Sequence, residues 1–288
     1  MLMHLRRILA GRGLWALLAL AVALVIACKS GNGGTPSPGA SPQLTPGATP
    51  PAAASPGATA SPQLQLSPQP SPVPADRNVL AHGDFEDCPE GDTPCGAWFA
   101  LKPPDFELSD VAHGGDTSAY LKMRDPDTAT GAKVYYLVQE VNPTEFPEVI
   151  SGYYRVENWV KGTPKQYLQF VVIVWGATNA PENSPGQRFP NHQIRYLEAG
   201  IDQDPFAIAN AKFFYISKDD PVEGTWVPFK VDVKQDFLDQ WGAVPEGYER
   251  IRLLFEVRYD DKLAESPSEA DVYYDDLYFG PAAGATVP

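Results

Sequence analysis

Alternating apolar and polar residues in the second half of the chain predict β-strands rather than helices. In the segment 248–259, Ile251, Leu253, Phe255 and Val257 fall on one face, and charged residues fall on the other. The other segments predicted as strands are rich in Val, Ile, Tyr and Phe and cover 133–142, 149–160, 166–176, 212–217, 226–234 and 272–279. Long helical periodicity is absent, and only 205–211 and 237–241 are predicted as short helices.

Many strands with one apolar face, separated by Pro and Gly, are typical of an antiparallel β-sandwich. Nearly all Trp, Tyr and Phe residues lie in the segment 76–281, which is about 205 residues long and suits one domain. The sequence therefore predicts an all-β fold, a jelly-roll sandwich, over 76–281, followed by a disordered tail at 282–288.

The N-terminus has the layout of an export signal, in which basic residues precede an apolar run from Leu14 to Ala27. This run of about 14 residues is shorter than the roughly 20 that a membrane-spanning helix needs. The residues Val25 to Cys28 resemble the lipobox of bacterial lipoproteins, which predicts a signal peptide at 1–27 and lipid attachment to Cys28. An ordinary secretory signal or an uncleaved anchor is the alternative.

Residues 28–75 are composed mainly of Pro, Ser, Gly, Ala, Thr and Gln and carry a single charge, Lys29. Such a composition cannot bury enough apolar surface to offset the entropy of ordering, so it predicts a disordered tether. Extended, the tether would reach on the order of 100 Å, which would present the domain at the cell surface outside the cytoplasm.

The charge of the chain argues against two classes of partner. Cleavage after residue 27 removes three arginines and no acid, which takes the formal net charge from −14 to −17. So acidic a protein repels nucleic acid and anionic lipid. The predicted contact with the membrane is therefore through the lipid anchor only.

Two further cysteines, Cys88 and Cys95, lie close together in CPEGDTPC. In an oxidising compartment such a pair forms a disulfide, which would pin a Pro- and Gly-rich turn. A metal-binding pair is the alternative, but no third and fourth ligand with matching spacing occurs nearby.

Three segments in this domain resemble carbohydrate-binding modules of the galactose-binding-like β-sandwich superfamily. NVLAHGDFE at 78–86, followed by Trp98, is similar to the opening NLL-x-N-G-D-F-E of those modules. VAHGGDTSAYL at 111–121 is similar to V-x-H-x-G-x-x-S-L-x-L, and VYYDDLYF at 272–279 to the terminal strand Y-I-D-D-V-x-L. The resemblance implies a galactose-binding-like jelly-roll fold and non-catalytic glycan binding, with a polysaccharide or surface glycan as partner.

The same resemblance implies a structural Ca²⁺ ion that joins the two ends of the domain. Glu86 and Asp275 match the carboxylate ligands, and Asp84, His113 and Asp116 match positions that offer backbone carbonyls. Asp275 also alternates with apolar residues, and a carboxylate on an apolar face needs a cation or strong donors. The choice between Asp275 and Asp276 stays open, with Asp275 ahead, and an acid that only caps a turn is the alternative.

Glycans are bound by flat aromatic rings beside planar hydrogen-bonding groups, and these residue types cluster on three predicted strands. We expect one sheet face to carry Tyr153, Arg155, Glu157, Trp159, Tyr167, Gln169, Trp175, Arg252, Glu256 and Arg258. Cover by a loop is the alternative for each tryptophan.

A structural or protein-interaction module without a sugar site is the competing function. An enzyme is the weaker alternative, in which Glu157 and Glu256 would act as an acid/base pair on a glycosidic bond. His82, His113 and His192 are isolated and show no spacing typical of a catalytic metal. We therefore predict no catalytic residues.

Overall fold

The structure is a computed structural model that describes residues 77–89, 91–285 and 287. The predicted signal peptide, the lipidation site Cys28 and the whole of the predicted tether lie outside these residues. Within the described part, no helix has the length and apolar character needed to cross a membrane.

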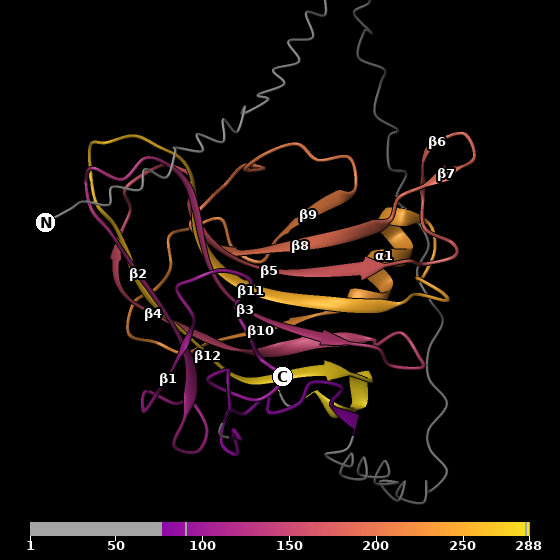
Figure 1. Ribbon diagram of the computed structural model, residues 1–288, viewed down its shortest axis with the longest axis horizontal. Helices are drawn as coiled ribbons and strands as arrows, with labels where there is room; N and C mark the ends of the chain where they lie inside the picture. The colour runs from indigo at the N-terminus through magenta and orange to yellow at the C-terminus, as the bar shows by residue number, and fades with distance from the viewer. Residues whose placement is uncertain (1–76, 90, 286, 288) are drawn as a thin grey trace, which may run out of the picture. The chain divides into compact units, whose positions relative to one another are not determined.

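Two five-stranded sheets form the domain (Figure 1). The sheet containing β4 has, in spatial order, β1 (Glu107–Ser109), β2 (Ser118–Asp125), β12 (Ser268–Gly280), β4 (Val149–Val160) and β10 (Val227–Val231). The sheet containing β5 has β3 (Gly131–Val141), β11 (Arg250–Lys262), β5 (Gln166–Trp175), β8 (Asn191–Ala199) and β9 (Ala211–Tyr215). We call them the β4 sheet and the β5 sheet.

Three short elements complete the described fold: the hairpin of β6 (Glu182–Ser184) and β7 (Gln187–Arg188), the helix α1 (Val233–Trp241), and a 3-10 turn at Ala282–Gly284. The helix predicted at 237–241 is confirmed and begins earlier, because Asp232 caps it by accepting a hydrogen bond from the Gln235 amide. The helix predicted at 205–211 is wrong, since these residues form turns and the start of β9.

The predicted all-β sandwich is confirmed. The chain changes sheet at each step from β2 to β5 and again at each step from β9 to β12, as in a jelly roll. Strand pairing is antiparallel with one exception among the paired strands, since β9 runs parallel to β8. The loop 200–210 between them carries the chain back along the sheet before β9 begins, which a tight hairpin cannot do.

Aromatic rings from both sheets meet in the core between them. Phe170 on β5 and Phe255 on β11 lie 5.8 Å apart between ring centres, and Phe255 contacts Tyr274 of the β4 sheet at 5.1 Å. All three side chains are buried. The alternation predicted for β5 and β11 therefore identifies the core face correctly.

The two ends of the domain lie side by side, as the resemblance implied. The Val79 amide donates to the Phe279 carbonyl at 2.8 Å, and the Leu277 amide donates to the Gly83 carbonyl at 2.8 Å. A Cβ atom at Gly83 would lie 2.1 Å from the Leu277 carbonyl oxygen, so only glycine allows this approach.

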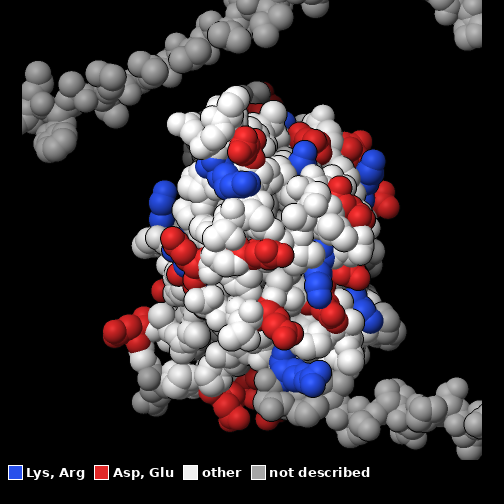
Figure 2. Space-filling view, turned by 90° about the vertical axis from the view of Figure 1, so that its right-hand side faces the viewer, with Lys and Arg blue, Asp and Glu red and all other residues white. Residues whose placement is uncertain are grey.

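Figure 2 shows the side of the domain that lies to the right in Figure 1, where α1 and the β6–β7 hairpin are found. Acidic and basic side chains are scattered there among uncharged ones. This face therefore offers no continuous basic patch for a polyanion.

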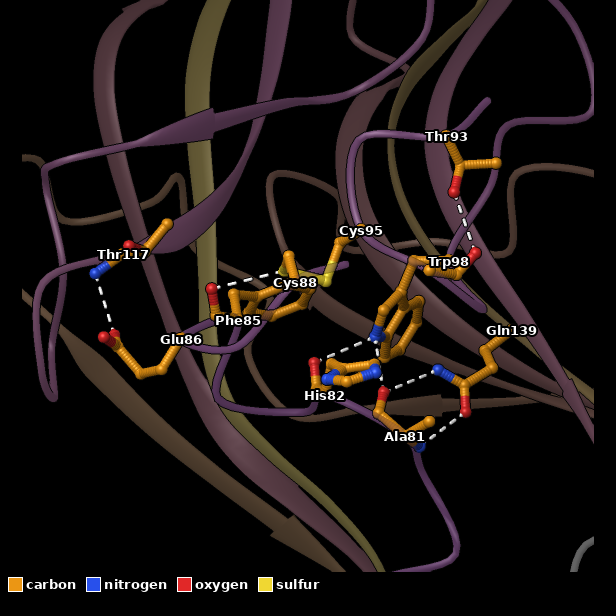
Figure 3. The surroundings of a disulfide bond; sticks show 11 residues. Ala81, His82, Phe85, Glu86, Cys88, Thr93, Cys95, Trp98, Thr117 and Gln139 are labelled. Atoms are coloured by element: carbon orange, nitrogen blue, oxygen red, sulfur yellow. Dashed lines mark hydrogen bonds between the residues drawn. A yellow bond between two sulfur atoms is a disulfide. The ribbon is translucent and has the colours of Figure 1, made fainter. Parts of the chain in front are cut away.

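The predicted disulfide between Cys88 and Cys95 is present, with the Cα atoms 4.6 Å apart (Figure 3). It adjoins Trp98, which is fully buried and donates its indole N–H to the carbonyls of Ala81 and His82 at 2.9 and 3.0 Å. The bridge therefore holds the first segment of the domain against the core.

Replacing both Cys88 and Cys95 by serine is expected to lower the free energy of unfolding by about 2–3 kcal/mol, because the bridge closes a short loop in the unfolded chain. Urea denaturation of the full-length protein measures this change. Reductant should destabilise the parent and leave the double variant unaltered; equal midpoints for the two proteins would contradict the prediction.

Candidate functional site

The ten predicted ligand residues do not share one face, and this expectation is wrong. Tyr153, Arg155, Glu157 and Trp159 belong to the β4 sheet, and the other six belong to β5 and β11 of the β5 sheet. The error came from assuming that consecutive strands are neighbours. The chain crosses the sandwich between β4 and β5, so their outer faces point in opposite directions.

A bulge in β4 moves Trp159 away from the predicted outer set. Asp271 pairs with Glu157, whereas Glu269 pairs with Val160, so β4 has one extra residue at this point. Asn158 absorbs it with a φ of 52°. Trp159 consequently packs against the core cluster rather than beside Glu157.

The other predicted residues of β4 contact nearby side chains of the domain, on β4 itself or in the loop before β2. Arg155 forms an ion pair with Glu157, and the ring of Tyr153 stacks on His113 with 3.6 Å between ring centres. Sequence reasoning missed the stacked pair of Tyr120 and Tyr273 on the adjoining strands β2 and β12, 4.9 Å apart. These rings stack on one another, so they do not present a flat open platform.

The outer face of the β5 sheet holds a buried group of polar residues that we call the arginine cluster: Tyr167, Gln169, Arg195, Glu256, Arg258 and Asp260. Strand register places Gln169 beside Glu256 and Tyr167 beside Arg258. Four of the six were predicted. Arg195 and Asp260 were missed because β8 was not predicted as a strand and Asp260 lies at the end of β11.

Hydrogen bonds and ion pairs connect most of the arginine cluster. Gln169 donates to Glu256 at 2.5 Å, and Tyr167 donates its hydroxyl to Asp260 at 2.8 Å. Arg258 lies 3.5 Å from Glu256 and 2.7 Å from Asp260. Burial lowers the pKa of Arg258, but Glu256, Tyr167 and Asp260 together outweigh burial and the pKa is raised.

The loop 200–210 covers the arginine cluster. Its Ile201 packs with Tyr167 and Leu197, and the ring of Phe206 lies 5.1 Å from the Arg195 guanidinium and 5.5 Å from that of Arg258. Phe206 itself is half-buried, and the neighbouring residues 207–209 are exposed. The cover is therefore one layer of side chains thick.

Three buried polar atoms of the arginine cluster have no hydrogen-bond partner among the described residues. They are Oε1 of Gln169, Nη1 of Arg195 and Nε of Arg258. A buried donor or acceptor without a partner costs about 1–3 kcal/mol, so such atoms are rare in stable folds. Their convergence at one place identifies this face as the candidate functional site.

Beyond the cover, the same sheet face continues to Trp175. The guanidinium groups of Arg250 and Arg252 lie 4.7 and 5.9 Å from its ring centre, and Arg252 also bonds Glu140 at 2.8 Å. Trp175 is partly buried, and its indole N–H has no partner in the described structure. This end of the face is more open than the arginine cluster.

Glu157 and Glu256 do not form an acid/base pair. Each lies on the outer face of a different sheet, with the core between them. Glu157 is paired with Arg155, and Glu256 is held by Gln169 and Arg258. The glycosidase mechanism suggested by their sequence therefore has no geometric basis.

The predicted metal residues come together where the domain ends meet. Glu86 accepts the backbone amides of Asp116 and Thr117 at 2.9 and 2.8 Å, the second of which is drawn in Figure 3. Asp275 accepts the amides of His113 and Gly114 at 2.7 and 3.1 Å. Both carboxylates therefore reach the same loop, 113–117.

Asp275 and Asp276 differ sharply in environment. Asp275 is fully buried, and burial raises its pKa to about 6 although three backbone amides act against this rise. Asp276 is half-exposed and lies 2.7 Å from Nδ1 of His113. Of the two, Asp275 is the buried carboxylate and has no cationic side chain beside it, so its environment agrees with the sequence analysis, which put Asp275 ahead of Asp276.

The donor set fits a hard cation such as Ca²⁺ in kind, because the two carboxylates retain lone pairs beyond those that accept the amides. Asp84 is exposed and can contribute only at the margin. Within the described part of the chain, no group of three or more Asp, Glu, His or Cys side chains is placed to hold a metal ion. Backbone carbonyls would have to complete the coordination.

Comparison with known proteins gives weak similarities only. No protein-family profile matches the chain, and no curated protein matches it. Among solved structures, the carbohydrate-binding module TmCBM61 in complex with β-1,4-galactotriose has a TM-score of 0.37 at 11% identity, over 70% of this chain and 97% of that one.

Two enzymes give similar values. The enzymatically active domain of bacteriophage CBA120 tailspike protein 4 has a TM-score of 0.36 at 12% identity, and the match spans 70% of this chain but only 21% of that chain. An ENZbleach xylanase mutant has 0.35 at 11%, over 73% and 87%. Similarity this low carries no argument about function, and the fold assignment stands on the strand pairing.

Proposed function

We propose that the protein is a non-catalytic, lipid-anchored glycan-binding protein of the cell surface, and that the glycan binds along the outer face of the β5 sheet. The observation that carries the proposal is the set of buried atoms on Gln169, Arg195 and Arg258 that find no hydrogen-bond partner in the described part of the chain. The hydroxyl groups of a sugar both donate and accept hydrogen bonds and its ring oxygen accepts them, so one ligand class can satisfy all three.

The layout of the face supports the proposal. The arginine cluster, with its amide, guanidinium groups and carboxylates, lies on the same sheet face as the indole of Trp175, and the apolar residues Val171, Ile173 and Leu254 lie between them. Few, converging polar groups beside an aromatic ring are typical of small-ligand and sugar sites. A Ca²⁺ ion at Glu86 and Asp275 would stabilise the fold at a distance from this face.

A protein-interaction module is the second candidate. The observation that favours it is the outer face of the β4 sheet, where Tyr120 and Tyr273 are stacked and Arg155 and Glu157 are partly exposed. The two functions predict different binding faces, so variants on each face separate them.

Replacing Trp175 by alanine is expected to weaken glycan binding at least tenfold, because its indole ring is the flat aromatic surface for a sugar at the open end of the site. Affinity electrophoresis of the full-length protein through a panel of polysaccharides measures the change. Lys122→Met, on the outer face of β2, is the control and should bind as the parent does. Uniform silence of the parent across the panel, with capture of a defined protein through the β4 sheet, would contradict the proposal.

A further inference from the structure

Arg195 differs from the other arginines of the binding face in having no acidic partner. Its Nε donates to Gln193 at 3.0 Å, and its Nη1 is buried without a partner among the described residues. No carboxylate of the described chain lies within ion-pair distance of it, whereas Arg258 contacts Glu256 and Asp260. Arg195 is therefore a largely buried cation without an anionic partner among the described residues.

The residues around Arg195 bury its guanidinium without neutralising it. Strand register sets Arg195 between Val171 of β5 and Phe213 of β9, and Phe206 covers the guanidinium. Burial lowers the pKa of Arg195, and Glu256 offsets this only in part. A buried guanidinium still stays protonated, so the unpaired charge is a standing cost in the folded protein.

Positive side chains are concentrated on this face in an otherwise acidic protein. Arg195, Arg250, Arg252 and Arg258 are four of the eight arginines at positions 77–288, in a mature chain of net charge −17. Arg250 and Arg252 pair with Glu140, Arg250 also approaches Glu249, and Arg258 pairs with Glu256 and Asp260. Arg195 is the one of the four without an ion pair among the described residues, which leaves its guanidinium for a ligand.

Resting on the proposed function, we infer that Arg195 binds a carboxylate group of the glycan, so that the ligand is an acidic polysaccharide containing uronic acid. A carboxylate has two oxygens that accept charge-assisted hydrogen bonds, and Nη1 of Arg195 and Nε of Arg258, which lack partners among the described residues, supply one N–H donor each. Phe206 and the loop 200–210 must move aside to admit it.

Short oligogalacturonates and their methyl esters form a matched pair for the test, because esterification removes the charge and keeps the sugar. Calorimetry of the full-length protein near 0.15 M salt limits the long-range repulsion from the acidic surface, since the Debye length is about 8 Å there. We expect the free acid to bind at least tenfold more tightly than the ester.

Arg195→Met should abolish that preference, reducing acid binding tenfold or more and leaving ester binding unaltered. Lys122→Met removes one positive charge elsewhere and should retain the preference. Phe206→Ala should speed association of the acid. Because methionine removes an unpaired buried charge, Arg195→Met should melt no lower than the parent.

The outcomes separate the two proposals. If the ester binds as tightly as the acid, or if Arg195→Met keeps the preference, the carboxylate assignment is wrong and glycan binding stands. Tighter binding of a sulfated glycan than of the free acid would also overturn it. If neither oligosaccharide nor any polysaccharide binds, the proposed function fails together with the inference. The acid–ester comparison on the parent decides the question even if a variant does not fold.

Discussion

A Glu198→Gln variant is expected to be more stable than the parent by about 4 kcal/mol at pH 9 and nearly equal to it at pH 5. Glu198 lies on β8, points into the core and is fully buried. One of its oxygens accepts the Tyr274 hydroxyl at 2.7 Å, and the other has no partner in the described structure. Burial raises its pKa from 4.5 to about 8.

The sign of the pH dependence follows from that shift. Between these two pKa values the folded protein keeps a proton on Glu198 that the unfolded chain releases. The free energy of unfolding therefore falls as pH rises from about 4.5 to about 8 and then levels off. Glutamine does not titrate, so the variant loses this slope, and any fixed cost of its amide group is the same at every pH.

Two other buried groups titrate at lower pH and leave the window above pH 7 clear. Burial lowers the pKa of His192 from 6.5 to about 4, which destabilises the fold on the acid side, and the pKa of Asp275 is about 6. Urea midpoints at pH 5, 7 and 9 measure the effect. Glu249→Gln, an exposed substitution, is the control; parallel pH profiles for parent and Glu198→Gln would contradict the prediction.

Periodicity predicted the long strands β3, β4, β5, β11 and β12, but it missed β2, although Ala119, Leu121 and Met123 form an apolar core face there. Alternation in β5 and β11 identified the core residues because each polar position there points away from the other sheet. It failed in β8, where the core-facing set of His192, Ile194, Tyr196 and Glu198 mixes polar with apolar side chains. A buried carboxylic acid looks like a surface residue until its environment is known.

The candidate site was predicted only in part, since its composition depends on which strands are neighbours. Gln169, Glu256 and Arg258 were singled out by their residue types, and the register of β5 with β11 brings them together. Nothing in the local pattern signals that β4 leaves for the other sheet or that the bulge at Asn158 turns Trp159 inward. Arg195 joins the site through β8, and Phe206 covers it from a loop that has no periodicity.

Contact between the domain ends was predicted only through the resemblance of three short segments to carbohydrate-binding modules, and the structure shows which local requirements these segments meet. Gly83 and Gly115 each leave no room for a side chain, as a Cβ at Gly115 would lie 2.3 Å from Oε1 of Glu86. Gly115 also has a φ of 60°, which favours glycine. Such constraints are local in sequence, whereas the loop cover and sheet membership are not.

Calcium added to chelator-treated, full-length protein is expected to raise its melting temperature by about 5–10 °C. A ligand present at about 100 times its dissociation constant stabilises the native state by about 2.7 kcal/mol, which is a shift of this size for a domain of about 200 residues. Asp275→Asn and Glu86→Gln should melt at the same temperature with calcium and with chelator. Differential scanning fluorimetry at fixed pH measures all three proteins.

The response to calcium, rather than the melting temperature itself, decides the assignment. Asp275→Asn also weakens the bonds from the amides of His113 and Gly114, so the variant melts lower whether or not a metal binds. Asp127→Asn, in an exposed acidic turn, removes a carboxylate elsewhere and should retain the full response. A parent protein indifferent to calcium, or an Asp275→Asn variant that still responds, would show that the loop amides alone satisfy these carboxylates. In that case hydrogen bonds alone, without a metal, hold the two ends of the domain together.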